Sequence, residues 1–131
     1  MRSRLRDERG ASAVEFGMIV PLLLVLLLGI IEFGHAFQVQ GTLSAAAREG
    51  ARRMALQNDQ TQARDAVQEA AAALSPGITD AQISIDPATC PIAQDTDTDV
   101  VVTISYPMPF LTGFFGATVG LSGRGVMRCQ G

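Results

Sequence analysis

One long apolar run with a single carboxylate at its start constrains this sequence more than any other feature. From Phe16 to Ile31 no side chain is charged or strongly polar, and Glu15 directly precedes the run. Extended to Phe37, the stretch has about 20 residues, enough for a helix to cross the roughly 30 Å hydrocarbon layer of a bilayer. A helix satisfies its own backbone hydrogen bonds in lipid, so such a run is stable there. We predict a transmembrane helix over residues 11–37.

Charges before the run predict its orientation. Residues 1–10 contain four arginines and two acidic side chains, and this positive excess favours a cytoplasmic N-terminus and an exported C-terminal part. A secretory signal peptide shows the same order of charge and apolar run, but it needs a small-x-small cleavage site just after the run. The segment Glu32–Phe37 is instead rich in aromatic residues. We therefore expect a single-pass cell membrane protein with an extracytoplasmic C-terminal domain.

The residues before the run fit a different processing signal. Arg9-Gly10, followed by Ala-Ser-Ala-Val-Glu-Phe, resembles the leader of a type IV prepilin, which is cut on the cytoplasmic side after a Gly and leaves Glu as the fifth residue. Counted from Ala11, Glu15 is fifth. Together with Glu15-Phe16, Pro21 in a Leu-rich run, Ile-Glu-Phe-Gly at 31–34 and Ala-Ala-Arg-Glu-Gly-Ala-Arg at 46–52, this pattern is similar to the TadE family, pilin-like components of tight-adherence (Tad) pilus systems. The resemblance is dense over residues 9–55 and resumes at 100–128.

This resemblance implies a structural role in a Tad-type (type IVb-like) pilus. The protein would be a membrane-anchored minor pilin or pseudopilin, with residues 1–10 as a cytoplasmic leader and cleavage by prepilin peptidase between Gly10 and Ala11. Glu15 and Phe16 would set the register between neighbouring helices. The implied partners are other pilin-like subunits, pilus assembly proteins, the peptidase and membrane lipid. The alternative is an uncleaved anchor whose extracytoplasmic domain binds another envelope protein.

Glu15 also has a purely structural interpretation. Ser12 and Glu15 have the spacing of a capping box, in which the two side chains satisfy backbone amides at the start of a helix. An ionised carboxylate at the membrane boundary nevertheless costs several kcal/mol unless it is paired, and the prepilin interpretation supplies the new α-amine of Ala11 as its partner. Pro21 lacks an N–H, so the carbonyl of Gly17 loses its helical partner and we expect a bend there.

Beyond the membrane run the sequence predicts an α+β domain of the type IV pilin kind. A helical extension covers residues 38–57, with a stripe of small and apolar residues suited to packing on a helix or a sheet: Leu43, Ala46, Ala47, Gly50, Ala51 and Met54. Asn58-Asp59 then predicts a stop and a new N-cap, and a second helix follows over residues 61–74. Residues 58–131 form the extracytoplasmic α+β domain in this scheme.

Alternating apolar residues predict a small antiparallel sheet after Gly77. The expected strands are 82–86, 100–106 and 118–129, packed against the helical stripe. Gly123 and Gly125 interrupt the third strand, and we interpret them as a β-bulge. The residues 1–10 before the long helix are short, charged and end in Gly, so we expect them to be disordered.

Both cysteines, Cys90 and Cys129, fall in the part predicted to be exported. An even pair in a small domain of an oxidising compartment is typical of a disulfide, whereas a redox motif or a zinc site needs more closely spaced cysteines or four ligands. Closing a loop of about 40 residues should stabilise so small a domain by roughly 3–4 kcal/mol in the chain-entropy model.

Several kinds of chemistry are not indicated. The net charge of −3 argues against nucleic acid, which needs a basic face. The sequence has no G-x-S-x-G, Walker loop or H-E-x-x-H motif, and only one histidine, so we predict no enzyme, no cofactor and no small-molecule substrate. The acidic run at 95–99 lacks the Gly and Glu of a calcium-binding EF-hand loop, so we also predict no metal site.

Overall fold

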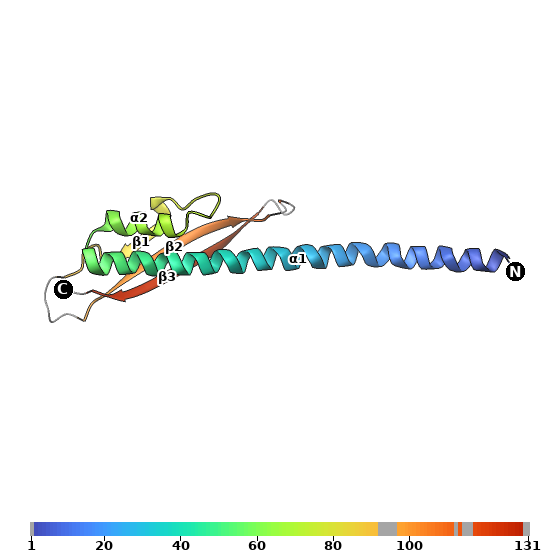
Figure 1. The fold of residues 1–131 in the computed structure, drawn as a ribbon, viewed down its shortest axis with the longest axis horizontal. Coiled ribbons are helices and arrows are strands. Elements are labelled where there is room, and N and C mark those ends of the chain that lie inside the picture. The colour runs from blue at the N-terminus through green and yellow to red at the C-terminus, as the bar shows by residue number, and fades with distance from the viewer. Residues whose placement is uncertain (1, 92–96, 112, 114–116, 130–131) are drawn as a thin grey trace. The chain divides into compact units, whose positions relative to one another are not determined.

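The chain has an α+β fold, as the sequence predicts. The computed structural model (Figure 1) describes residues 2–91, 97–111, 113 and 117–129. Helix α1 spans Arg2–Gln57 and helix α2 spans Gln60–Ala70. A short 3₁₀ helix, η1 (Asp80–Gln82), leads into three strands, which are β1 (Ile83–Asp86), β2 (Asp99–Pro109) and β3 (Thr118–Arg128). These elements form two compact units, Met1–His35 and Ala36–Gly131.

The three strands form one antiparallel sheet in the order β1-β2-β3. The whole of β2 pairs with β3, from Asp99 opposite Arg128 to Pro109 opposite Thr118. The alternation of β2 buries one of its faces, and the buried residues are Val100, Val102, Ile104, Tyr106 and Met108. The predicted strands are therefore confirmed, with β2 longer than expected because the alternation continues through its two prolines.

The C-terminal part of α1 forms the core of the second unit. Leu43, Ala46, Ala47, Ala51 and Met54 are all 0% exposed, and Gly50 is buried. A Cβ atom on Gly50 would collide with the side chain of Val67 in α2 and would lie 3.5 Å from Cγ1 of Val102 in β2. The predicted packing stripe is confirmed, and it contacts both the second helix and the sheet.

The prediction of a β-bulge at Gly123 and Gly125 is wrong. The register between β2 and β3 runs without an extra residue from Thr118 to Arg128. Instead, a Cβ on Gly123 would lie 2.5 Å from the backbone C and O atoms of Leu43, and one on Gly125 would collide with the backbone of Ala47. These glycines are needed because the backbone of α1 approaches β3 too closely for any side chain to fit between them.

Helix α1 begins at Arg2, whereas we expected residues 1–10 to be disordered. The adjoining apolar segment supplies a helix that is already nucleated, and adding a turn to an existing helix costs little, even across a glycine. Ser12 therefore lies inside α1 and cannot be its N-cap. The capping box predicted for Ser12 and Glu15 does not form.

The end of α1 and the start of α2 lie where the sequence predicts them, but α2 ends earlier than predicted. Asn58 has a positive φ of 50° and donates its N–H to the carbonyl of Met54, which ends α1 in a left-handed cap. Asp59 is the N-cap of α2, as predicted, and accepts hydrogen bonds from the N–H groups of Thr61 and Gln62. Helix α2 stops at Ala70 and not at residue 74, because the following hydrogen bonds tighten into a turn that packs Leu74 against the core.

The close approach of α1 to β3 predicts a position-specific effect of adding one methyl group. Gly123→Ala should destabilise the second unit by about 1–3 kcal/mol, the usual cost of overpacking, because the α1 backbone cannot move away without opening the core. Gly120→Ala on the same strand is the matched control, since a Cβ there meets nothing within 4 Å. Thermal unfolding of the full chain in detergent measures both, and equal midpoints for the two variants would contradict the packing argument.

Candidate membrane anchor and processing site

The first unit is the apolar N-terminal part of α1, and most of its apolar side chains from Val14 to Phe33 are exposed. Phe16 and Leu22 are each 70% exposed and Met18 is 76% exposed. By length and composition this is the one helix in the described part of the chain that is able to cross a membrane, and none of its most apolar window is buried within the chain. A core helix of a soluble protein would be covered, so this segment is a candidate membrane anchor.

The predicted processing site lies on this exposed helix. Gly10 and Ala11 are both in α1 and both exposed. A Cβ on Gly10 would meet nothing within 4 Å, so no packing requirement in the described structure explains a glycine at this position. Gly10 is also an unfavourable residue for a helix interior, by about 1 kcal/mol relative to alanine.

Glu15 lies among exposed apolar side chains of α1. Its neighbours Val14 and Phe16 are 63% and 70% exposed, and within the part of the chain that the structure describes no ion pair involves Glu15. Because Ser12 is inside the helix, no capping role accounts for this carboxylate. Its cost in lipid is several kcal/mol unless another group pairs with it.

Pro21 lies within α1, and the helix continues on both sides of it. The bend expected there remains a prediction. The proline ring removes one hydrogen bond, which membrane helices tolerate. Gly10, Ala11, Glu15, Phe16 and Pro21 thus all belong to one helical segment.

The comparison with known families bears on this same segment. Residues 10–52 match the family model described as TadE-like protein. This segment is TadE-like. The match begins at Gly10, includes Glu15 and Pro21, and covers about a third of the chain. Proteins of this family are described as components associated with Tad pili. No curated protein and no solved structure matches it.

The TadE-like segment ends inside the second unit, which carries a disulfide. Cys90 and Cys129 are bonded, with their Cα atoms 5.7 Å apart and a sequence separation of 39 residues. The bond joins the loop after β1 to the residue that follows β3, and the N–H of Cys129 donates to the carbonyl of Thr98 at 2.9 Å. It therefore closes the end of the sheet at which β2 begins and β3 ends.

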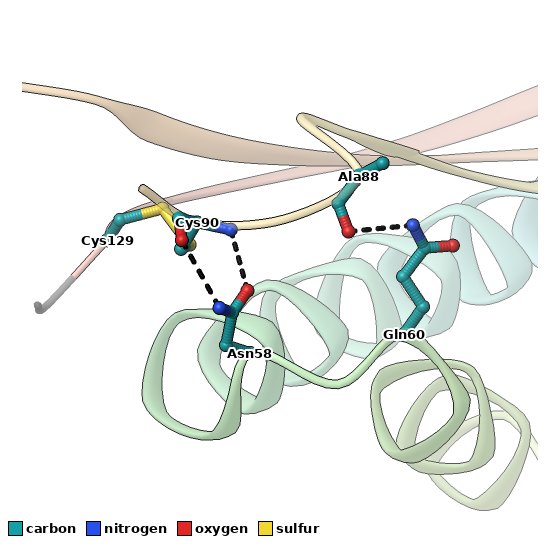
Figure 2. Close-up of a disulfide and its surroundings, with 5 residues drawn as sticks. All are labelled: Asn58, Gln60, Ala88, Cys90 and Cys129. Atoms are coloured by element: carbon teal, nitrogen blue, oxygen red, sulfur yellow. Dashed lines mark hydrogen bonds between the residues drawn. A yellow bond between two sulfur atoms is a disulfide. The ribbon is translucent and has the colours of Figure 1, made fainter. Parts of the chain in front are cut away.

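Asn58 holds the disulfide loop against the junction of α1 and α2 (Figure 2). Its Nδ2 donates to the carbonyl of Cys90 at 3.2 Å, and its Oδ1 accepts from the Cys90 N–H at 2.6 Å. Next to this pair, Nε2 of Gln60 donates to the carbonyl of Ala88 at 2.8 Å. Sequence reasoning found Asn58 as a helix stop but missed this contact. The side-chain amide of Asn58 has a donor and an acceptor, which suit a backbone carbonyl and a backbone N–H. The sequence around Asn58 does not indicate which loop supplies them.

Two titratable groups of the second unit have shifted pKa values. Hydrogen bonds from the backbone and side chain of Gln62 and from the backbone of Thr61 lower the pKa of Asp59 below its ordinary value of 3.8. Burial raises the pKa of Tyr106 above 10.0, and its hydroxyl donates to the carbonyl of Pro76 at 2.7 Å. Both groups have structural roles, one as a helix cap and the other in closing the turn after α2.

The acidic run at 95–99 lies partly within the described residues. In the described ranges no three His, Cys, Asp or Glu side chains gather as metal ligands do. Positions 95 and 96 of the acidic run lie outside the described residues. Asp97, in the same run, binds Nη2 of Arg128 at 2.7 Å.

The disulfide should carry much of the stability of the second unit. Replacing both Cys90 and Cys129 by Ala should lower its free energy of unfolding by about 3–4 kcal/mol, because the unfolded chain gains the freedom of a long open loop. Thermal unfolding of the full chain with and without reducing agent measures this effect. The double variant is the control for the effect of reducing agent itself. It has no disulfide to reduce, so its unfolding midpoint should be the same with and without reducing agent. An unchanged midpoint for the reduced wild-type chain would show that the bond is not stabilising.

Proposed function

We propose that this protein is a minor pilin or pseudopilin of a Tad-type pilus, made as a prepilin and cut after Gly10. The observation that supports this function best is the start of the TadE-like segment at Gly10, five residues before a carboxylate that directly precedes the uncharged apolar run of residues 16–31. An apolar helix needs no carboxylate in order to insert in a bilayer, and Glu15 weakens insertion. Its presence calls for a partner that appears later.

Cleavage supplies such a partner. Hydrolysis of the peptide bond between Gly10 and Ala11 leaves a positive α-amine on Ala11. Positions 11 and 15 are separated by one helical turn, so an amine and a carboxylate there lie on the same face of the helix. The amine can neutralise Glu15 of its own chain or of a neighbouring subunit, and the second arrangement fixes the axial register between two helices. Phe16 then lies beside the paired charges as an apolar contact.

The proposed topology follows from the same segment. Residues 1–10 are the cytoplasmic leader, residues 11–37 span the membrane, and the remainder is extracytoplasmic. Residues 38–57 extend the helix into the exported part, where the stripe from Leu43 to Met54 is the core of the second unit. The prepilin peptidase, other pilin-like subunits and membrane lipid are the proposed partners. A disulfide between Cys90 and Cys129 is consistent with an oxidising compartment.

The second candidate function is an uncleaved single-pass anchor that presents the second unit to another envelope protein. The helix is continuous through Gly10 and Ala11, which favours this alternative, because proteases bind extended chain and the helix must first unwind locally. The two functions differ in the chemistry of the N-terminus.

The first test is the intact mass and N-terminal sequence of the protein from its own membranes. We expect a chain that begins at Ala11, because the peptidase removes residues 1–10. A Gly10→Leu variant is expected to keep the leader, and Gly17→Leu in the same helix is the control that should still be cut. A wild-type chain that still begins at Met1 in cells with active peptidase would contradict the processing step and leave the uncleaved anchor.

A second test addresses the role of Glu15. Glu15→Gln should abolish or strongly reduce pilus assembly, because the uncharged side chain cannot pair with the new amine, while insertion in the membrane should be unchanged or improved. Glu69→Gln, at an exposed position of α2, is the matched control and should assemble normally. Counts of surface pili and fractionation of membranes measure the two properties. Normal assembly of the Glu15 variant would mean that this carboxylate does not set the register.

A further inference from the structure

The two edges of the sheet differ in how far they are closed to a further strand. The outer edge of β1 has only four residues, and Nη1 of Arg64 donates to the carbonyl of Ile83 at 2.8 Å. Beyond the end of β1, the edge of β2 carries Pro107 and Pro109, which have no N–H to offer a further strand. Both devices are ways in which natural sheets prevent another strand from pairing.

The outer edge of β3 is open over its C-terminal part. Cys129 donates its N–H to Thr98, and these two positions continue the register of β2 and β3. Since hydrogen-bonded pairs alternate along an antiparallel ladder, the odd-numbered residues of β3 bond to β2 and the even-numbered ones point outward. Ser122, Arg124 and Val126 therefore present their backbone groups at the free edge.

One of these outward groups is capped by α1, and the next ones are not. Nε2 of Gln40 donates to the carbonyl of Ser122 at 2.6 Å. Among the residues that the structure describes, no hydrogen bond reaches the outward backbone groups of Arg124 or Val126. In Figure 1 the end of β3 extends clear of the helix that crosses it.

Exposed apolar side chains lie on both faces of this open stretch. Val126 is 46% exposed and lies opposite Val101 on the outer face, whereas Met127 is 39% exposed on the other face. Arg124 and Arg128 flank Val126 on the outer face, two positions away on either side. Arg128 is paired with Asp97, but in the described part of the chain no ion pair involves Arg124. The open edge is therefore apolar at its centre and positive at its side.

We propose that the free edge of β3 from Arg124 to Arg128 binds an extended segment of another protein, which adds to the sheet as a fourth strand. The occupant carries an apolar side chain beside Val126 and a carboxylate beside Arg124, because cross-strand neighbours on one face contact directly. A second copy of β3 paired symmetrically about Val126 is disfavoured. Antiparallel pairing centred on Val126 would place Arg124 of one copy opposite Arg128 of the other, and like charges in that position are destabilising. This proposal does not depend on prepilin processing.

The test uses the full chain in detergent micelles and two synthetic peptides. The acidic peptide alternates threonine with valine and carries two glutamates, and the basic peptide has lysines in their place. We expect saturable binding of the acidic peptide, measured by fluorescence anisotropy, and slower amide hydrogen exchange at Arg124 and Val126. The basic peptide should bind more weakly.

Two variants separate strand addition from other modes of binding. Val126→Pro removes one outward N–H without removing a hydrogen bond to β2, so it should abolish peptide binding while the unit stays folded. Arg124→Glu should lower the affinity for the acidic peptide by about threefold, as expected for the loss of one cross-strand charge pair. The same variant should bind the basic peptide more tightly. Arg52→Glu on α1, also an exposed arginine, is the control and should change neither.

Four results would overturn the proposal. They are the absence of saturable binding, equal binding of both peptides to the wild-type chain, unchanged binding to folded Val126→Pro, and self-association of the chain that Val126→Pro abolishes. The last result would assign the edge to a second copy.

Discussion

The contact between the backbone of α1 and the glycines of β3 is the interaction on which the second unit depends. With Gly123 and Gly125 against the backbone of Leu43 and Ala47, the helix lies directly on the strand and its small side chains fill the space that remains. Gly50 of α1 similarly allows α2 to pack closely, because a Cβ at this position would collide with the side chain of Val67. A unit with so few large side chains gains its buried area from short distances between backbones. The residues that allow these short distances are glycines, so a search for large apolar side chains does not identify them.

The disulfide and Asn58 add covalent and polar contacts at one end of the same core. Cys90 and Cys129 are both buried in the cluster that includes Met54 and Ala55 of α1. There the covalent bond joins Cys90 to the end of β3, and the Asn58 amide joins the backbone of Cys90 to the helix junction. Two kinds of contact, one covalent and one polar, thus reinforce the hydrophobic core at this end. Such reinforcement matters most in small domains, because their cores alone supply little stability.

Sequence reasoning predicted those features that depend on a period or on a local signal. The apolar run, the stripe on α1, the alternation in β2 and the N-cap at Asp59 all have such signals, and the fold class follows from them. The reason for the glycines in β3 could not be found in the same way, because a bulge and a close approach both select glycine and only the opposing element distinguishes them. The start of α1 was missed since local composition does not show that a neighbouring helix extends across Gly10. At the candidate site, the positions of Glu15 and Pro21 on one exposed helix followed from sequence, whereas the Asn58 contact required knowledge of a loop about 30 residues away.

The position of the disulfide in the chain also has a consequence for biogenesis. Cys90 precedes β2 and Cys129 follows β3, so the bond encloses the two long strands of the sheet. In the proposed topology, in which this unit is extracytoplasmic, Cys90 has no intramolecular partner until both of those strands have crossed the membrane. Closure of the bond therefore marks a subunit whose sheet is complete. In that topology, a molecule stalled earlier in translocation would keep a free thiol at Cys90.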